Sequence, residues 1–267
     1  MTHSAKPISI LQISDLHVLP HRNDKLLGVA TEYYFKQALQ HAFEQYQAFD
    51  LILVSGDLAQ DPCLDSYQRI YEILSAYQTK TVCLPGNHDD WALMQKVLNA
   101  GCVSCEKRLL CGEWQLINLN SQKLTDPGGY LQQTELDFLV ESLSSEPERP
   151  TLIAVHHNCT PSYSAWLDTM IISNAPDFFA ILKNYPQVKA ITTGHIHQLL
   201  ETQHQGIFIF GVPSTCFQFK PNCKDFTLDT IAPGYRVLQL YPDGQMTTQV
   251  HRLPFAIAEL HTDSAGY

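Results

Sequence analysis

The sequence predicts an α/β fold in which strands and helices alternate and pack in layers. Short apolar, β-branched runs, such as residues 8–14 and 151–155, are typical of buried strands. Longer segments between them carry apolar residues at helical spacing, as at Tyr34, Ala38 and Ala42. A late run of strands with few helices indicates an added antiparallel portion. We therefore expect a mixed sheet system.

The elements follow in a regular order along the chain. Strands are expected at residues 8–14, 49–54, 81–84, 113–119, 151–155, 190–192, 206–210, 235–240 and 246–251. Helices are expected at residues 31–47, 64–77, 91–99, 134–144 and 175–185. We expect Asn174 to be the N-cap of the last helix, with Pro176 in its first turn. No repeat or long linker divides the chain, so we expect a single domain spanning residues 1–267.

Composition and charge argue against some classes of partner. The 267 residues carry a formal net charge of −10, and no run of Lys or Arg forms a basic stripe. Binding a nucleic-acid backbone needs clustered cations, so we expect no nucleic-acid partner. No apolar run approaches the roughly 18 residues of a membrane span. The first seven residues lack the apolar core of a signal peptide, so we expect a cytoplasmic protein that contacts no membrane.

The eight cysteines favour reduced thiols, because no secretion signal accompanies them. Cys102 and Cys105 form a CxxC pair, and Cys111 lies nearby. No second pair completes a zinc cage, so a structural zinc site at these cysteines is disfavoured.

Residues suited to metal binding follow five of the predicted strands. They are Asp15 and His17, Asp57, Asn87 and His88, His156, and His195 and His197. Each signal is weak alone, because Asp, Asn and Gly are common in turns. A layered α/β fold brings the carboxyl ends of its strands to one edge, so five such ends together indicate a single site. On an extended segment, His195 and His197 would point their imidazoles to the same side.

Seven of these eight side chains form a chemically consistent ligand set. Two carboxylates, one amide oxygen and four imidazoles suit Mn, Fe or Zn. Seven ligands are too many for one tetrahedral ion, but they suit two ions about 3.5–4 Å apart with one bridging carboxylate. Two divalent ions, two aspartates and a bridging hydroxide leave a net positive charge. The site could therefore accept a phosphate anion in an otherwise acidic protein.

The order of these motifs resembles that of the calcineurin-like metallophosphoesterases. The shared pattern is DxH at 15–17, GD at 56–57, GNHD at 86–89, a strand-end histidine at 156 and GHIH at 194–197. GDLAQD at 56–61, GHIHQ at 194–198 and PSTCFQFKPNCKDFTLDTIAPGYR at 213–236 are similar to bacterial class III 3′,5′-cyclic AMP phosphodiesterases. The resemblance covers nearly the whole chain, down to Gly266 and Tyr267. It implies a layered sandwich of two mixed β-sheets flanked by helices, with strands from about residue 206 completing the second sheet.

The resemblance also implies a role for each site residue. One metal would be held by Asp15, His17 and His197, the other by Asn87, His156 and His195, and both by a bridging Asp57. His88 would lie outside the metals and face the scissile phosphate as the catalytic residue. The phosphate would also be lined by His17, Asp57, Asn87 and His197. The resemblance favours iron as the metal, with manganese or zinc as alternatives.

We therefore expect hydrolysis of cyclic AMP to 5′-AMP by a hydroxide that bridges two metals. His88 is the best-placed proton donor for the O3′ leaving group, because an imidazole can be cationic near neutral pH. Asp61 or Asp89 could orient His88. One rival is a metallophosphoesterase that acts on another phosphodiester or on a phosphomonoester. The other is a non-catalytic, protein-binding scaffold, which predicts missing ligands, whereas all seven are present.

Two features of the sequence leave alternatives open. The chain continues from His156 as His157 and Asn158, where many relatives have His or Pro after the paired histidines. A substrate contact at Asn158 is therefore in doubt, and for His157 we favour a packed position at the strand end. Aromatic residues that could stack on adenine, although core packing is the favoured interpretation, are Phe217, Phe219 and Phe226.

Overall fold

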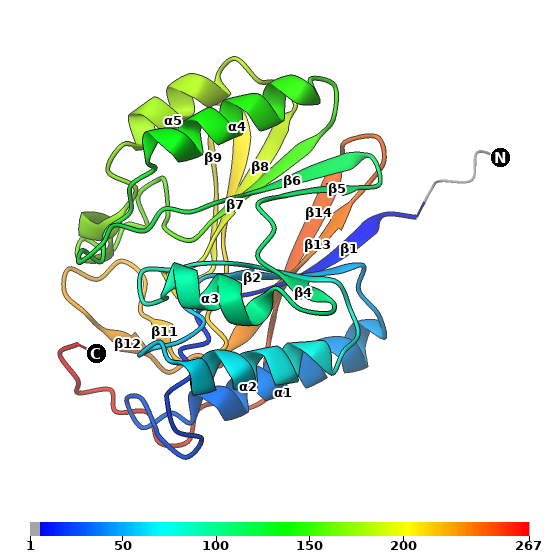
Figure 1. Cartoon of the computed structure of the whole chain (residues 1–267). Coiled ribbons are helices and arrows are strands. Elements are labelled where there is room, and N and C mark those ends of the chain that lie inside the picture. Colours follow the sequence, from blue (N-terminus) through cyan, green and yellow to red (C-terminus); the bar gives the residue numbers. More distant parts are fainter. Residues whose placement is uncertain (1–5, 267) are drawn as a thin grey trace.

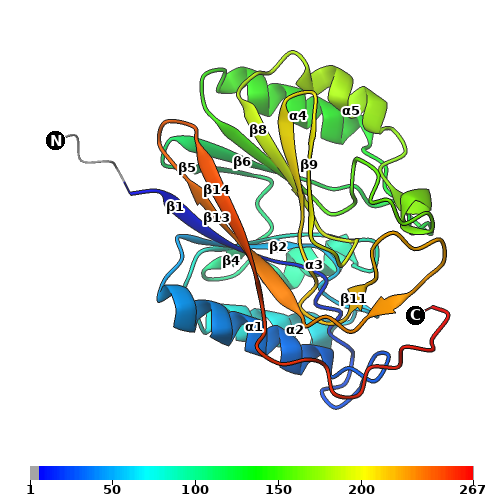
Figure 2. The same cartoon turned by 180° about the vertical axis from the view of Figure 1, so that it is seen from behind.

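Two six-stranded sheets pack face to face, and helices cover the outer face of each, as Figures 1 and 2 show. The computed structural model describes residues 6–266. Both sheets contain parallel and antiparallel pairs, so the prediction of two mixed sheets flanked by helices is confirmed.

The first sheet has the strand order β14-β13-β1-β2-β3-β4. Its strands are β1 (Ile8–Ile13), β2 (Leu51–Ser55), β3 (Thr81–Leu84), β4 (Val103–Ser104), β13 (Gly234–Leu240) and β14 (Met246–Arg252). The first four are parallel, whereas β13 is antiparallel to both β1 and β14. Its outer face is covered by α1 (Thr31–Tyr46), α2 (Leu64–Ser75) and α3 (Trp91–Leu98).

The second sheet has the strand order β5-β6-β7-β8-β10-β9. Its strands are β5 (Arg108–Cys111), β6 (Trp114–Leu119), β7 (Thr151–Val155), β8 (Val188–Thr193), β9 (Leu200–His204) and β10 (Ile207–Gly211). The outer face is covered by α4 (Gln133–Ser145) and α5 (Ala175–Leu182). A short helix, η1 (Leu167–Met170), and a small ribbon of β11 (Gln218–Phe219) and β12 (Leu228–Asp229) lie beyond the sheets.

Alternation along the strands assigns each side chain to one of the packed layers. In β2, Leu51 and Leu53 belong to the core between the two sheets, whereas Ile52 and Val54 belong to the core under α1 and α2. Successive side chains of a strand face opposite sides, so an unbroken apolar run predicts a strand covered on both faces. This arrangement leaves the ends of the strands as the places where polar side chains can gather.

The C-terminal strands differ from the prediction. β10 joins the second sheet, but β13 and β14 extend the first sheet beside β1 instead of completing the second. A strand's own alternation shows which of its faces are buried, but not which sheet edge it joins. The pattern also missed β5 and β9, because β9 is a mostly exposed edge strand with little apolar character.

Asn174 precedes α5 as predicted, but its side chain does not cap the helix. Its amide instead makes two hydrogen bonds with the backbone of Leu131, accepting at 2.9 Å and donating at 2.9 Å. The side chain therefore ties α5 to the segment before α4. Among the described residues, no helix has the length and apolar character needed to cross a membrane.

Candidate metal centre

The structure brings all eight expected site residues together at one edge of the sandwich. The parallel strands that supply them are β1, β2, β3, β7 and β8. Four overlapping groups have nitrogen and carboxylate oxygen atoms within 4.8 Å of one another: Asp15, His17 and His197; Asp15, Asp57 and His156; His17, Asp57 and His88; and His156, His157 and His195. Asn87 joins them through its Oδ1, which lies 3.2 Å from Nε2 of His156.

The backbone at several of these residues is left-handed rather than extended. Five of the expected ligands have positive φ angles, namely Asp15 (54°), His17 (46°), Asp57 (50°), His195 (65°) and His197 (47°). A non-glycine residue in this region costs on the order of 1–3 kcal/mol, and such residues concentrate at functional sites. The prediction that His195 and His197 project from an extended segment is therefore wrong. Both lie in a turn after β8, where the N–H of Ile196 donates to the carbonyl of Gly194 at 2.7 Å.

Glycines let the ligand-bearing loops approach one another. A Cβ on Gly194 would lie 2.1 Å from Oγ of Ser14 and 2.7 Å from the carbonyl oxygen of Ser55. Gly56 has a φ of 96°, and a Cβ there would lie 2.2 Å from Nδ1 of His156. A side chain at either position would therefore crowd this edge of the sandwich.

Hydrogen bonds to Nδ1 fix the orientation of three histidine rings. Nδ1 of His156 donates to the carbonyl oxygen of Ser55 at 2.9 Å, and Nδ1 of His197 donates to that of Phe217 at 2.9 Å. Nδ1 of His17 lies 2.7 Å from Oε1 of Gln60. Each ring therefore carries its Nδ1 hydrogen outwards and turns Nε2 to the centre, as metal-binding histidines do.

The atoms that meet at the centre are electron-pair donors. Nε2 of His17 lies 3.2 Å from Nε2 of His197, which in turn lies 3.3 Å from a carboxylate oxygen of Asp15. Nε2 of His156 lies 3.2 Å from a carboxylate oxygen of Asp57. Lone pairs this close repel one another unless positive charge lies between them, as protons or as metal ions.

One buried nitrogen at the centre has no hydrogen-bond partner among the described residues. It is Nε2 of His195, a residue that is only 6% exposed. An unpaired buried polar group costs about 1–3 kcal/mol. A bound metal ion would remove that cost. This orphaned nitrogen and the facing lone pairs show that the residues fit a two-metal centre of His, Asp and Asn ligands.

The protonation of the site suits metal binding. Burial lowers the pKa of His17 to about 3 and lowers that of His195 well below its usual value, so both rings are neutral ligands at physiological pH. Burial also lowers the pKa of His156, but Asp57 and Asp15 outweigh it and raise the value to about 9. Without a metal, His156 therefore holds a proton that an ion would displace.

His157 has the packed position at the strand end that is expected from the sequence. It is fully buried, and its two ring nitrogens contact the hydroxyl of Ser121 at 2.7 Å and the carbonyl of Pro127 at 3.1 Å. Although it lies near His156 and His195, both of its nitrogens are therefore engaged away from the centre. Asn158 is also fully buried, and its side chain donates to the carbonyl of Thr160 at 2.8 Å.

The suggestion that Asp61 or Asp89 orients His88 stays a prediction. Asp61 is exposed. Asp89 is buried and accepts hydrogen bonds from the backbone N–H groups of Leu58 (3.1 Å), Ala59 (3.1 Å) and Gly86 (2.9 Å). It therefore joins the loop after β2 to the loop after β3. His88 is held by its own N–H, which donates to Oδ1 of Asp57 at 2.9 Å.

Several residues that support the site are assigned no role by the sequence. Gln60 contacts His17, and Tyr67 donates to Oδ1 of Asp89 at 2.9 Å. Gln122 donates to the carbonyl oxygens of Gly86 at 2.5 Å and of Asp89 at 2.7 Å. Single polar residues on a helix or loop do not show what they contact, so only the tertiary structure identifies them.

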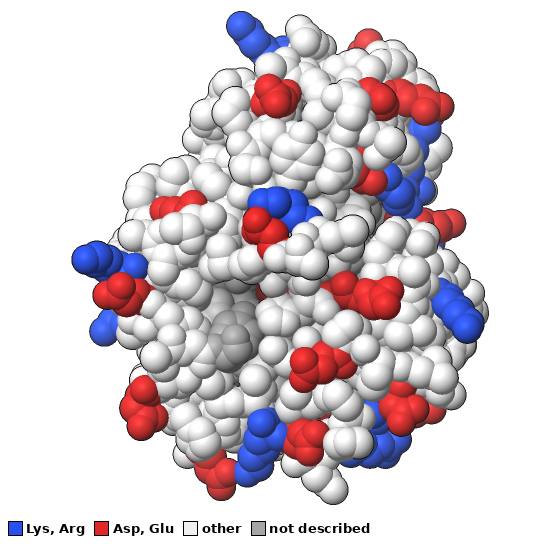
Figure 3. Space-filling model, turned by 60° about the vertical axis from the view of Figure 1, so that its left-hand side comes forward, with Lys and Arg blue, Asp and Glu red and all other residues white. Residues whose placement is uncertain are grey.

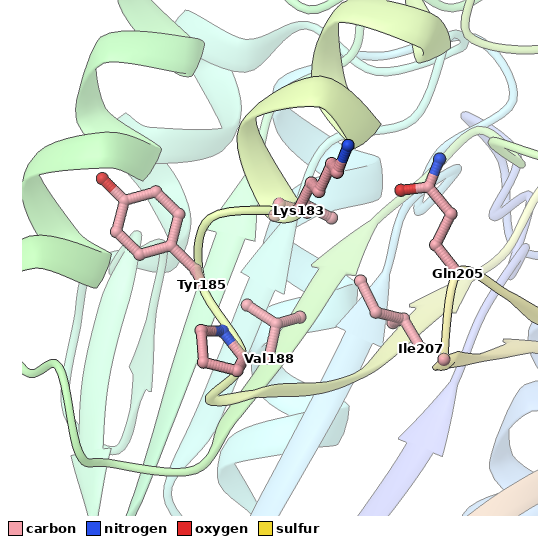
Figure 4. Close-up of a pocket in the computed structure, with 8 residues that line it drawn as sticks. Lys183, Tyr185, Val188, Gln205 and Ile207 are labelled. Carbon is pink, nitrogen blue, oxygen red and sulfur yellow. The ribbon is translucent and has the colours of Figure 1, made fainter.

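Of two cavities described here, only one adjoins the candidate metal centre. One, of about 320 Å³, is lined by Asn87, His88 and His195 of the centre, together with Phe219 and Phe226. Phe217 is absent from that lining and fully buried in the core. A larger cavity of about 610 Å³ lies where β8 and β10 begin, between Lys183, Tyr185 and Gln205 (Figure 4). It is at the opposite end of those strands from the centre and contains none of the candidate ligands.

The surface carries charged residues of both signs. On the face shown in Figure 3, Lys and Arg are interspersed with Asp and Glu and form no continuous basic patch.

Comparisons with known proteins agree with the site and the fold. Residues 8–199 match the family model of the calcineurin-like phosphoesterases. The 3′,5′-cyclic adenosine monophosphate phosphodiesterase CpdA of Escherichia coli (strain K12) is 41% identical over 261 residues, which cover 97% of this chain and 95% of that protein. A 3′,5′-cyclic-nucleotide phosphodiesterase from Nostoc sp. is 39% identical, with 98% of each chain covered.

A solved structure extends the comparison to more distant proteins. A dimetal phosphatase from Danio rerio has a TM-score of 0.68 and 12% identity, with 92% of this chain and 96% of that chain covered. At that identity, the likeness shows the fold alone. The match over residues 8–199 and the nearly full-length relatives lead to one conclusion: the chain belongs to the calcineurin-like phosphoesterase family.

Proposed function

We propose that this protein hydrolyses 3′,5′-cyclic AMP to 5′-AMP at a centre that holds two divalent metal ions. The observation that carries the proposal is that Asp57 is shared by two clusters of potential metal ligands. One cluster contains Asp15 and His156, and the other contains His17 and His88. Cyclic AMP as the substrate is supported by relatives of that name, 41% identical over nearly the full length. A monoester or a different phosphodiester is the rival that the experiment below must separate.

The division of ligands follows the distances between donor atoms. We assign Asp15, His17 and His197 to one ion, and Asn87, His156 and His195 to the other. Asp57 is assigned to both, because its Oδ2 lies 3.2 Å from Nε2 of His156 and 3.8 Å from Nε2 of His17. Imidazole and carboxylate ligands suit iron, manganese and zinc. Iron is our first choice because the resemblance of the motifs favours it, and manganese and zinc are the alternatives.

The metals and the protein would contribute different parts of the reaction. When bound, the two ions would supply positive charge for the phosphate and lower the pKa of a water at the site. In the hydrolysis, an oxygen from water bonds to phosphorus, the bond from phosphorus to O3′ breaks, and O3′ takes up a proton. The side chains proposed to line the phosphate are His17, Asp57, Asn87, His88 and His197.

His88 is proposed as the donor of the proton to O3′. Its Nδ1 lies 3.3 Å from the carbonyl oxygen of Gln60, which can only accept, so Nδ1 carries a hydrogen and Nε2 is the nitrogen that exchanges protons. The backbone N–H of the same residue is held by the carboxylate of Asp57. These contacts fix both the position and the tautomer of the ring beside the proposed phosphate site.

A substrate panel tests the proposal. Metal-loaded protein would be assayed against cyclic AMP, 2′,3′-cyclic nucleotides and phosphomonoesters, with the products separated by chromatography. We expect the highest kcat/KM for cyclic AMP, with 5′-AMP as the product. Faster turnover of a monoester or of a 2′,3′-cyclic nucleotide would assign the site to that substrate, and no turnover of any substrate would favour the scaffold alternative.

We also propose that the protein works in the cytoplasm. Its eight cysteines are all free, and Cys83, Cys105, Cys159 and Cys216 are buried. Thiols in this state suit a reducing compartment.

A further inference from the structure

The cavity beside the candidate metal centre is lined by polar residues of the centre and by apolar and aromatic residues from other segments. Asn87, His88 and His195 belong to the centre, whereas most of the remaining lining comes from Trp166, Leu167, Met170, Phe219 and Phe226. No Asp, Glu, Lys or Arg of the described chain lines it. Its volume of about 320 Å³ is at the lower end of the roughly 300–1,000 Å³ typical of small-molecule sites.

Trp166 stands at the start of η1 and is held in place by two other aromatic rings. The ring centroids of Trp166 and Phe219 are 4.9 Å apart at 82°, and those of Trp166 and Phe226 are 5.2 Å apart at 67°. These edge-to-face contacts fix the indole without covering it completely, because Trp166 remains partly exposed. Its Nε1 is buried and has no hydrogen-bond partner within residues 6–266.

Part of the cavity is lined by Ala265 and Gly266, which belong to residues 253–266, here called the terminal segment. It continues from β14 along the first sheet's helical layer to the β11–β12 ribbon (Figure 2). Glu259 pairs with Lys25, and the N–H of His261 donates to the carbonyl of Leu27 at 3.0 Å. These anchors bring Ala265 and Gly266 to the lining of the cavity.

Gly28 allows the terminal segment to lie this close. It has a φ of 82°, and a Cβ at this position would lie 1.9 Å from the carbonyl oxygen of Glu259. Any side chain there would push the segment away from the loop that holds it. The loop and the segment therefore fit together only with glycine at position 28.

We propose that this cavity is the base subsite of the enzyme, in which a purine ring stacks on Trp166 and the terminal segment forms the outer wall. The inference rests on the proposed function, because it assumes a nucleotide whose phosphate lies at the metal centre. The apolar and aromatic part of the lining suits a neutral planar ring, because a base can stack on the face of an aromatic side chain. The subsite would favour cyclic nucleotides over phosphodiesters that lack a base.

The first test compares cyclic AMP with methyl ribofuranoside 3′,5′-cyclic phosphate, which has the same reacting group and no base. Trp166→Leu should lower kcat/KM for cyclic AMP about tenfold to a hundredfold, mainly through KM, because base stacking is lost. The loss should be confined to the substrate with a base. Trp166→Phe should retain most of the preference. Phe208→Leu changes an exposed ring that does not line this cavity, so it should leave kcat/KM unchanged for both substrates.

The second test concerns the terminal segment. Gly28→Ala should displace it, seen as faster hydrogen exchange at residues 259–266, and should raise KM for cyclic AMP several-fold with little effect on the base-free substrate. The matched control is Gly206→Ala, because Gly206 has a similar φ of 85° and nothing within 4 Å of the added carbon. If Gly28→Ala frees the segment and KM for cyclic AMP does not change, the segment is not a wall of the subsite.

The outcomes separate this inference from the proposed function. Equal kcat/KM values for the two substrates in the wild-type protein, or equal losses on both in Trp166→Leu, would overturn the base subsite while the hydrolase assignment stands. Absence of cyclic AMP hydrolysis by the metal-loaded wild-type protein would instead overturn the proposed function.

Discussion

At the scale of single residues, the site depends on which ring nitrogen of each histidine carries hydrogen. The carbonyl oxygens of Ser55 and Phe217 accept from Nδ1 of His156 and His197, and so leave Nε2 of each as a donor of electrons. His157 is equally buried, but both of its ring nitrogens form hydrogen bonds, one with Ser121 and the other with Pro127. Adjacent histidines therefore have different capacities to bind metal, and hydrogen bonding decides between them.

The first prediction compares two buried histidines. His195→Asn should lower the metal content from two ions per chain towards one, because the substitution removes the nitrogen that has no other partner. His157→Asn should retain both ions, although it disturbs a buried pair of hydrogen bonds and lowers stability. Elemental analysis of both purified variants checks this. Equal loss of metal in the two would mean that His157 is also a ligand.

The second prediction concerns His88. His88→Ala should keep both ions and lose about 10²–10⁴-fold in kcat on cyclic AMP, because a general acid contributes that much. A ring nitrogen of His88 lies within 4.8 Å of potential ligand atoms of His17 and Asp57, so the alternative is that His88 binds a metal. A variant that lost an ion together with its activity would support that alternative.

At the scale of elements, two loops must be held against each other for the ligands to meet. Asp89 joins them, because its carboxylate accepts from backbone groups after β2 and after β3 and from the hydroxyl of Tyr67. The residue lies next to the centre but acts on backbone geometry. Its effect should therefore be visible in stability without any metal.

The third prediction follows from those contacts. Asp89→Ala should lower the free energy of unfolding of the metal-free protein by roughly 2–4 kcal/mol, because several buried N–H groups lose their acceptor. Tyr67→Phe, which removes only one hydroxyl, should cost less, on the order of 1 kcal/mol. Urea unfolding measures both. A smaller loss for Asp89→Ala than for Tyr67→Phe would contradict the role given to the carboxylate.

At the scale of the whole molecule, the two sheets share a core. Leu51 and Leu53 of one sheet pack with Leu116 and Leu152 of the other, so neither sheet buries its inner face alone. β13 pairs with β1, which joins the C-terminal part of the chain to the N-terminal part. We propose on these grounds that the chain is a single domain.

The fourth prediction is that the metal-free protein unfolds in one calorimetric transition, and that metal raises its midpoint. Binding at a free-metal concentration of 100 Kd adds about 2.7 kcal/mol per site. For a chain of this size that corresponds to roughly 5–10 °C. Two separate transitions in the metal-free protein would show that the halves fold independently.

The sequence predicted the layers and the site more completely than the connections between them. The strands with unbroken apolar runs, such as Thr151–Val155, and the polar residues after them are local signals that need no knowledge of the rest of the chain. The sheet joined by β13 and β14 depends on which edge is open, and the left-handed turns at His195 and His197 depend on what surrounds them. Neither is encoded in the periodicity of a single segment.

The most direct test of the account is turnover measured against the metal bound per chain. Metal-free protein would be titrated with Fe²⁺ or Mn²⁺ under anaerobic conditions, with bound metal measured by elemental analysis and 5′-AMP by chromatography. We predict that turnover of cyclic AMP rises until two ions are bound per chain and then stays constant. Full turnover with a single ion, or no turnover with two, would contradict a two-metal cyclic AMP phosphodiesterase.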